Sequence, residues 1–279
     1  MFYRTFGREV ASVLLKAVVV TLTIIFLIVF ASSYSELQTV SDGECNIAVM
    51  PLEGVILPFA GYDDYELVIT PGTVRDFVAT AEDDLNIDGI LFEINSPGGT
   101  PVAAEQISQL IKNTELPTVS VIGDIGASGG YLVAAAADKV LASAMSDVGS
   151  IGVTMSYVEE SEKNKEEGLT FVPLASGKFK DAGNPNKPLT DEERALFEGD
   201  LALVHDEFVR QVAELRGKSV EEIEALADGA AMPGMRALEK GLIDEIGGRE
   251  RAREIFSATL GVDVSQVSFC EYEPATLFY

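Results

Sequence analysis

The chain has 279 residues and a formal charge of −25, because 45 Asp and Glu residues stand against 20 Lys and Arg residues. A single His and two Cys are too few for a zinc site built from His and Cys ligands, which needs about three or four of them. The negative charge argues against a nucleic-acid-binding protein, since such proteins carry a basic surface. Two Cys in so long a chain also exclude a disulfide-rich scaffold, and 47% hydrophobic residues are enough for a globular core.

Residues 1–35 differ in composition from the rest of the chain. Three basic residues, the last of them Lys16, precede an apolar run over 17–34. As a helix this run would be about 27 Å long, close to the roughly 30 Å hydrocarbon core of a bilayer. The small residues at 31–33 leave a cleaved signal peptide as the alternative. We expect an uncleaved single-pass anchor, with the N-terminus in the cytoplasm and the rest of the chain outside, because the positive charges precede the span.

After a polar linker over 36–45, short apolar runs alternate with segments of helical spacing. The expected strands are 46–53, 89–94, 117–122, 139–141 and 168–174, and the expected helices are 73–82, 102–112, 126–137 and 190–215. Strands separated by helices of about 10–15 residues are typical of crossover connections in a parallel sheet. The sequence therefore predicts an α/β protein.

The helix expected at 190–215 has both a start signal and an apolar face. Thr190, with Glu193 three residues later, matches a capping box. The residues that form the apolar stripe are Phe197, Leu201, Val204, Phe208, Val212 and Leu215. The charged segment 159–167 is interpreted as a solvated helix face.

The two cysteines, Cys45 and Cys270, lie close to the two ends of the expected α/β domain. If this domain is outside the cytoplasm, both thiols are in a compartment where disulfides persist. Whether they pair depends on the distance between their Cα atoms, which the sequence leaves open.

Glycine-rich turns follow two successive strands, as Asn95-Ser-Pro-Gly-Gly99 and Gly126-Ala-Ser-Gly-Gly130. Glycine permits a positive φ, and the backbone N–H groups of such turns can hold an oxyanion or a phosphate. Ser128 in the second turn has small neighbours and is a candidate nucleophile, with a helix N-cap as the alternative. Two such turns in one parallel sheet favour a ligand site, because ligands bind at the carboxyl ends of strands.

A nucleophilic serine needs a base, and the sequence offers a histidine and two lysines. His205 falls in the middle of the long helix and is interpreted as a boundary residue. Lys178 and Lys180 lie in a segment after an expected strand. A lysine acts as a base only if its pKa falls from about 10.4 to about 7–8, which takes about 4 kcal/mol of desolvation or charge repulsion. Such a base must therefore be enclosed in an apolar pocket.

Four motifs, in this order and spacing, resemble the signal peptide peptidase A family. They are Asn95-Ser-Pro-Gly-Gly99, Gly126-Ala-Ser-Gly-Gly-Tyr131, Gly149-Ser-Ile-Gly152 and Ser176-Gly-Lys-Phe-Lys-Asp181, within a similarity from about Asn46 to Ile255. The resemblance implies a ClpP/crotonase-like α/β fold with parallel sheets and crossover helices, preceded by one transmembrane helix. It also implies a membrane-anchored serine endopeptidase with a domain at 46–259 and a tail at 260–279.

The resemblance assigns roles to individual residues. Ser128 matches the nucleophile and Lys180 the general base, while the backbone N–H groups of Gly99 and Gly129 match the oxyanion hole. Ser150 matches a serine that orients the lysine. The implied substrates are signal peptide remnants and other hydrophobic peptides, with no metal, cofactor or nucleic acid. The implied assembly is a ring or dome, in which the serine and the lysine can come from neighbouring subunits.

The chain departs from the family pattern in its C-terminal part. The family often has Arg after Asp-Gly, where this chain has Ala230, and an aromatic residue shortly afterwards, where it has Met232. One alternative function is a membrane-anchored scaffold that keeps the fold without hydrolysis, although its expected signature, loss of the Ser-Lys pair, is absent. Acyl-CoA chemistry on the related crotonase fold is disfavoured by the negative charge and the outside topology.

Overall fold

The computed structural model describes residues 14, 16, 18–26, 40–41, 43–60 and 67–271. The chain divides into two compact units, at residues 1–39 and 40–279. In the first unit the described residues are helical. The anchor and linker expected over 1–45 thus fall largely outside the described residues. Within the described part, no helix is both long and apolar enough to cross a membrane.

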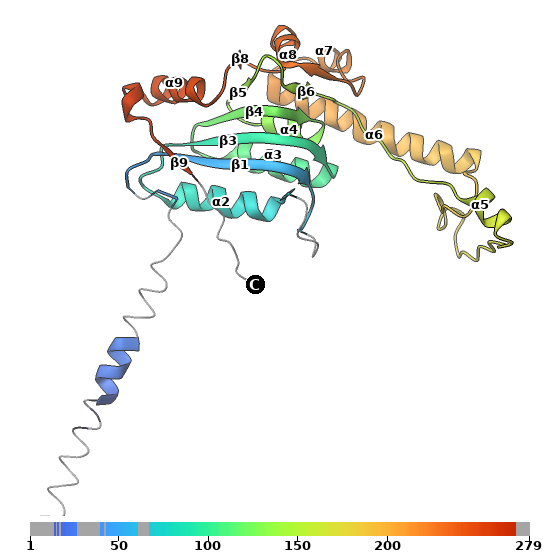
Figure 1. Ribbon diagram of the computed structural model, residues 1–279, viewed down its shortest axis with the longest axis horizontal. Coiled ribbons are helices and arrows are strands. Elements are labelled where there is room, and N and C mark those ends of the chain that lie inside the picture. Colours follow the sequence, from blue (N-terminus) through green and yellow to red (C-terminus); the bar gives the residue numbers. More distant parts are fainter. Residues whose placement is uncertain are drawn as a thin grey trace, which may run out of the picture. The chain divides into compact units, whose positions relative to one another are not determined.

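The second unit is an α/β structure built on one sheet (Figure 1). Its strands are β1 (Ile47–Ile56), β2 (Val68–Ile69), β3 (Gly89–Gly99), β4 (Thr118–Ala127), β5 (Lys139–Ala142), β6 (Asp147–Gly149), β7 (Ala231–Pro233), β8 (Glu245–Ile246) and β9 (Phe269–Glu271). Its helices are α2 (Pro71–Asp83), α3 (Pro101–Asn113), α4 (Gly129–Ala135), α5 (Ser161–Glu166), α6 (Asp191–Arg216), α7 (Val220–Glu224), α8 (Gly234–Lys240) and α9 (Arg249–Leu260), with a 3₁₀ turn η1 (Val264–Gln266).

The sheet is almost entirely parallel. Its main path runs β2-β1-β3-β4-β5-β8, with every neighbouring pair parallel. β6 continues beside β4 and pairs antiparallel with β7, while β9 runs parallel to β1. Helix α2 connects β2 to β3, α3 connects β3 to β4 and α4 connects β4 to β5, all of them strands of this path. The predicted parallel sheet with crossover helices is thus confirmed.

Strand side chains alternate between two apolar layers, as the period of two in a strand requires. On one face, Met50 and Phe92 are buried with residues of α2, α3, α4 and α6. On the other face, Val49 and Leu91 are buried with Phe256 of α9. Both faces of the central strands are therefore covered, which explains why these strands read as continuous apolar runs.

One expected strand does not form. Residues 168–174 have no strand partner, and Leu169, Val172 and Leu174 are exposed. These residues belong to the arm, which we define as residues 152–200 and which contains α5 and the first part of α6. Figure 1 shows α5 beyond the N-terminal end of α6, away from the sheet. A short apolar run becomes a strand only beside a partner strand, and the arm supplies none among the described residues.

The helix expected at 190–215 matches α6 closely. The Thr190 hydroxyl accepts from the backbone N–H of Glu193, and the Glu193 carboxylate accepts from the N–H of Thr190, so the capping box is confirmed. The helix ends at Gly217, which has a φ of 60°. Of the predicted apolar stripe, Val212 is fully buried in the core. Several earlier members of the stripe lie on the part of α6 that extends beyond the core.

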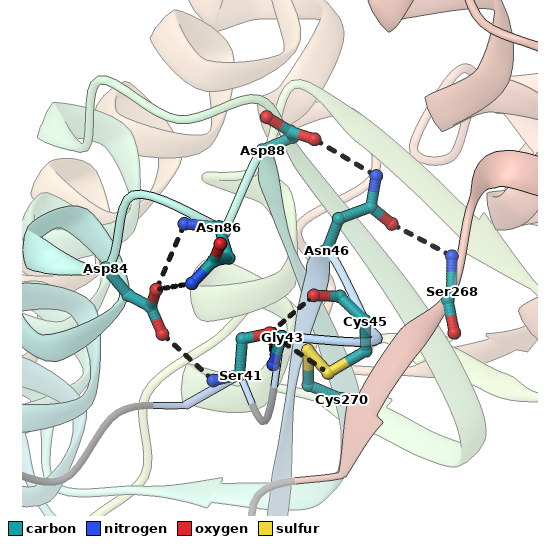
Figure 2. Close-up of a disulfide and its surroundings, with 9 residues drawn as sticks. All are labelled: Ser41, Gly43, Cys45, Asn46, Asp84, Asn86, Asp88, Ser268 and Cys270. Atoms are coloured by element: carbon teal, nitrogen blue, oxygen red, sulfur yellow. Dashed lines mark hydrogen bonds between the residues drawn. A yellow bond between two sulfur atoms is a disulfide. The ribbon is translucent and has the colours of Figure 1, made fainter.

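Cys45 and Cys270 form a disulfide with their Cα atoms 5.3 Å apart (Figure 2). The bond joins the chain just before β1 to β9, two segments separated by 225 positions in the sequence. Beside it, the Asn46 amide donates to Asp88 and its oxygen accepts from the N–H of Ser268. The start and the end of the domain are thus fastened to each other at one edge of the sheet.

Asp84, which follows α2, anchors the segment that leads into β1. One carboxylate oxygen accepts from the backbone N–H of Ser41, and the other accepts from the backbone and side chain of Asn86 (Figure 2). Burial by itself would raise the pKa of Asp84, but these hydrogen bonds together hold it below its usual value. The carboxylate therefore stabilises the fold in its charged form.

Candidate active site

The two glycine-rich turns lie side by side at the carboxyl ends of β3 and β4. Ser96 in the first turn is paired with Gly126 in the second. Gly98 has a φ of +99°, and a Cβ atom there would lie 2.7 Å from the backbone nitrogen of Gly129. A side chain at this position would collide with the neighbouring turn, so the close approach requires glycine.

Ser128 stands where β4 turns into α4. Its backbone has φ 52° and ψ −125°, a conformation that residues other than glycine rarely adopt. The strain is held in place by a hydrogen bond from its N–H to the carbonyl of Gly149, at 2.7 Å. Strained backbone at a strand-to-helix turn is how a nucleophile elbow presents its side chain. Ser128 occupies the N-cap position, but its hydroxyl makes no capping hydrogen bond.

Gly99 and Gly129 meet beside Ser128. A Cβ atom built on Gly129 would lie 3.4 Å from the backbone nitrogen of Gly99. Both glycines and Ser128 line the same cavity, of about 390 Å³. The structure thus brings the predicted nucleophile together with both predicted oxyanion-hole residues.

Ser150 is close to this turn through the pairing of β4 with β6, where Ala127 is the partner of Gly149. It has a φ of 50°. Its N–H donates to the carbonyl of Ala230 and its hydroxyl to the carbonyl of Gly229, at 3.1 and 2.8 Å. Within one chain the Ser150 side chain therefore bonds to the segment before β7, and not to a lysine.

Lys180 lies in the arm and is exposed. Its neighbour Lys178 pairs with Glu192 at the start of α6, at 2.8 Å. Lys180 itself forms no side-chain hydrogen bond or ion pair with any residue that the structure describes. Of the two lysines considered from the sequence, Lys180 is the one whose amino group stays available.

The structure does not bring Lys180 to Ser128 of the same chain. The lysine segment packs at the start of α6, next to Glu192, whereas α6 first lines the Ser128 cavity at Leu203. Eleven residues of helix separate these two positions, which is about 16 Å along the axis. His205 does not take its place, because its Nε2 lies 3.1 Å from the carbonyl of Ala227 and the residue does not line the cavity.

The cavity beside Ser128 is mainly apolar. Its walls include Leu132 of α4 and three residues of α6, namely Leu203, Val204 and Phe208. Val204 and Phe208 belong to the stripe predicted from helical spacing, so the pattern identified two lining residues without indicating what they line. A volume of about 390 Å³ is in the range of pockets that bind small ligands, which suits side chains of a bound peptide.

Polar residues from two helices also line this cavity. Glu105 of α3 accepts a hydrogen bond from the Gln211 amide of α6, at 2.9 Å, and the same amide donates to Glu207 at 2.8 Å. Hydrogen bonds from Arg210 and then Gln211 lower the pKa of Glu207 to about 2. No sequence signal pointed to these residues, because α3 and α6 are far apart along the chain.

Among the described residues, no three His, Cys, Asp or Glu side chains gather in a way that could hold a metal ion.

Residues 111–263, more than half of the chain, match the sequence profile of peptidase family S49. The chain belongs to this family. The S49 match includes both strand-end serines, Ser128 and Ser150, and the arm with Lys180. The resemblance to signal peptide peptidase A, which four motifs indicated, is confirmed.

Curated relatives agree with the S49 assignment. A provisionally named protease of Methanocaldococcus jannaschii is 35% identical over 173 residues, which are 61% of this chain and 56% of that protein. A provisionally named signal peptide peptidase of Enterococcus faecium is 33% identical over 61% of this chain and 51% of its own length. A provisionally named protease of Synechocystis is 32% identical, over 64% and 65% of the two chains. The chain thus spans about half to two thirds of these relatives.

Proposed function

We propose that this S49 protein is a serine endopeptidase in which Ser128 is the nucleophile. The observation that carries the proposal is the strained Ser128 beside the N–H groups of Gly99 and Gly129 at an apolar cavity. This arrangement supplies a half-buried serine that lines the cavity, donors for an oxyanion and room for a peptide side chain. Membership of a peptidase family supports the same reaction class.

In the proposed reaction, neutral Lys180 accepts the Ser128 proton as Oγ attacks the peptide carbonyl. The carbonyl oxygen becomes an oxyanion that the N–H groups of Gly99 and Gly129 stabilise, where loss of one donor typically lowers the rate by about 10²–10³. Lys180 then gives its proton to the leaving amine, and water hydrolyses the acyl-enzyme. Ser150 would orient the lysine amino group once it is at the site.

Lys180 would reach Ser128 of a neighbouring subunit in a ring or dome. Two features support this assembly: the distance along α6 between the lysine segment and the cavity, and the exposed apolar side chains of the arm. A lysine becomes a base when it is enclosed and desolvated, and burial of the arm against another subunit would enclose it. The assembled protein would thereby complete the site.

The proposed substrates are signal peptide remnants and other hydrophobic peptides. The apolar walls of the cavity and the name of the Enterococcus faecium relative support this choice. A single-pass anchor within residues 1–35, with the catalytic domain outside the cytoplasm, would hold the enzyme where such peptides accumulate. Alkaline extraction of membranes tests the anchor, since an anchored chain stays in the pellet and a peripheral one is released.

Hydrolysis of fluorogenic hydrophobic peptides by the purified full-length chain tests the activity. We expect cleavage, and we expect Ser128→Ala to lower it by at least about 10⁴-fold. Cleavage that survives in Ser128→Ala would refute the assignment of the nucleophile. Absence of cleavage by the unaltered protein, with assembly verified, would favour the scaffold alternative.

A further inference from the structure

The cavity beside Ser128 contains a carboxylate that an enzyme for purely apolar side chains does not need. Glu105 is half-buried on α3, between the fully buried Ala104 and Ile107 that fix the helix against the core. Its Oε1 accepts from the Gln211 amide, and this is its only side-chain hydrogen bond with the residues that the structure describes. A carboxylate in partly apolar surroundings is costly unless a positive charge comes to it.

The other charges near this end of the cavity are already paired. Glu207 accepts two hydrogen bonds from the Arg210 guanidinium, at 2.8 and 2.5 Å. Arg210 also donates to Glu214, and Lys112 of α3 forms an ion pair with the same carboxylate. Glu105 has no ion-pair partner in the described part of the chain, so its negative charge is the one left uncompensated at the cavity.

Gln211 connects the two carboxylates that line the cavity, Glu105 and Glu207. Of these, Glu207 is paired with Arg210, whereas Glu105 has no ion-pair partner among the described residues. The Gln211 amide donates to Glu105 and to Glu207, at 2.9 and 2.8 Å. An amide that donates to both holds the Glu105 side chain in place without neutralising it. The second Glu105 oxygen, Oε2, accepts no hydrogen bond from the described residues and remains available for a donor from a ligand.

We propose that Glu105 extends the specificity of this cavity to lysine-type side chains of the substrate. The proposal rests on the proposed function, with the cavity receiving a side chain next to the cleaved bond. The aliphatic stem of such a side chain would lie along Leu132 and Phe208, and its ammonium group would donate to Glu105. Apolar side chains would use the same walls without this contact. The enzyme would then cleave after both apolar and basic residues.

A pair of substrates that differ in one charge tests the inference. Two fluorogenic peptides, identical except for lysine or norleucine before the cleaved bond, are assayed with the full-length protein. We expect Glu105→Gln to lower the lysine-to-norleucine ratio of kcat/KM by about tenfold, because a hydrogen bond to a charged group is lost. Glu105→Asp keeps the charge and is expected to retain part of the ratio. An unchanged ratio in Glu105→Gln would overturn the proposal.

Controls separate this inference from the proposed function. Cleavage of the norleucine peptide is first shown to require Ser128, so that the ratio is measured on an established peptidase. Glu115→Gln, at an exposed residue outside the cavity, is the matched charge change and is expected to leave the ratio unaltered. With the unaltered enzyme, salt is expected to lower the ratio by screening the contact. An equal loss on both peptides in Glu105→Gln would indicate a structural role and refute the specificity assignment.

Discussion

The carboxyl ends of the strands and the arm contribute the two halves of the proposed site in different ways. Around Ser128, Gly129 and Tyr131 are buried, and the strained turn is held by strand pairing with β6. Lys180, in contrast, lies on an exposed segment without a strand partner. In the proposed enzyme, the fold would prepare the nucleophile and the oxyanion hole within one chain, and assembly would position the base.

The surface of the arm differs from the buried surroundings of Ser128. Leu174 is 95% exposed and Val158 75% exposed, which is unusual for large apolar side chains in such number on one segment. The helical part of the arm is solvated and rich in local ion pairs, such as Lys165 with Glu162 at 2.6 Å. The arm thus combines apolar residues suited to contact with a neighbour and charged residues that keep a free chain soluble.

Removal of the base should have the largest effect. Lys180→Ala is expected to lower peptide hydrolysis by at least about 10⁴-fold. The unfolding transition should stay unchanged, because the Lys180 side chain is exposed and forms no hydrogen bond or ion pair with any residue that the structure describes. Lys178→Ala is the matched control, since it removes an exposed ion pair with Glu192 that contributes at most about 1 kcal/mol. If Lys178→Ala were inactive and Lys180→Ala active, the base would be Lys178.

A charge on the arm should separate assembly from folding. Leu174→Glu introduces a carboxylate at an almost fully exposed position, so the free energy of unfolding of the isolated chain should change by less than about 0.5 kcal/mol. We expect smaller particles by light scattering and at least about tenfold lower hydrolysis, because a buried charge at a subunit contact is unfavourable. Normal particle size together with normal activity would exclude this part of the arm from the contact.

The stability of the sheet that carries the strand ends can be tested through the disulfide between Cys45 and Cys270. Replacing both cysteines by serine removes a cross-link between positions 225 residues apart and should lower the free energy of unfolding by about 2–4 kcal/mol. The expected loss arises mainly because the unfolded chain becomes less constrained. Urea unfolding of the oxidised and double-serine forms measures it, and identical midpoints would contradict the role given to the bond. A truncated chain for such work should begin before Cys45.

Asp84 should have a smaller and pH-dependent effect. Asp84→Ala removes the acceptor for Ser41 and Asn86 and is expected to lower the free energy of unfolding by about 1–3 kcal/mol. Asp83→Ala, at the exposed neighbouring residue, is the matched control and should change it little. Because hydrogen bonds hold the folded-state pKa of Asp84 below its ordinary value, its stabilisation is present above that ordinary value and lost as the pH falls through the lowered pKa. When unfolding is measured from pH 7 down to pH 3, the difference in free energy of unfolding between the unaltered protein and Asp84→Ala should shrink at the acid end.

Much of the sheet could be predicted from the sequence because its signals are local. The apolar runs of β3 and β4, the capping box at Thr190 and the glycine turn around Ser128 each depend on residues within a few positions of one another. The expected strand at 168–174 is a short apolar run, but pairing depends on a partner strand that the run itself does not reveal. Asp84 was also missed, because its partner Ser41 lies 43 positions away.

Other features could not be predicted from the sequence, because they depend on distances between residues that are far apart along the chain. Pairing of Cys45 with Cys270 was left open, since it depends on how β9 returns to β1. Glu105 and Gln211 are 106 positions apart, and neither belongs to a recognisable motif. The position of Lys180 relative to Ser128 likewise depends on the course of α6, which helical periodicity describes without giving its direction in space.

The central claim is that one subunit provides Ser128 and another provides Lys180, and mixing two inactive variants tests it most directly. Ser128→Ala and Lys180→Ala chains are combined in equal amounts, dissociated and reassembled. If the dyad is shared between neighbours, about a quarter of the sites in a randomly mixed ring should pair an intact serine with an intact lysine. Hydrolysis should then return to about a quarter of the unaltered activity. Activity no higher than that of either variant alone, in verified mixed assemblies, would contradict the account.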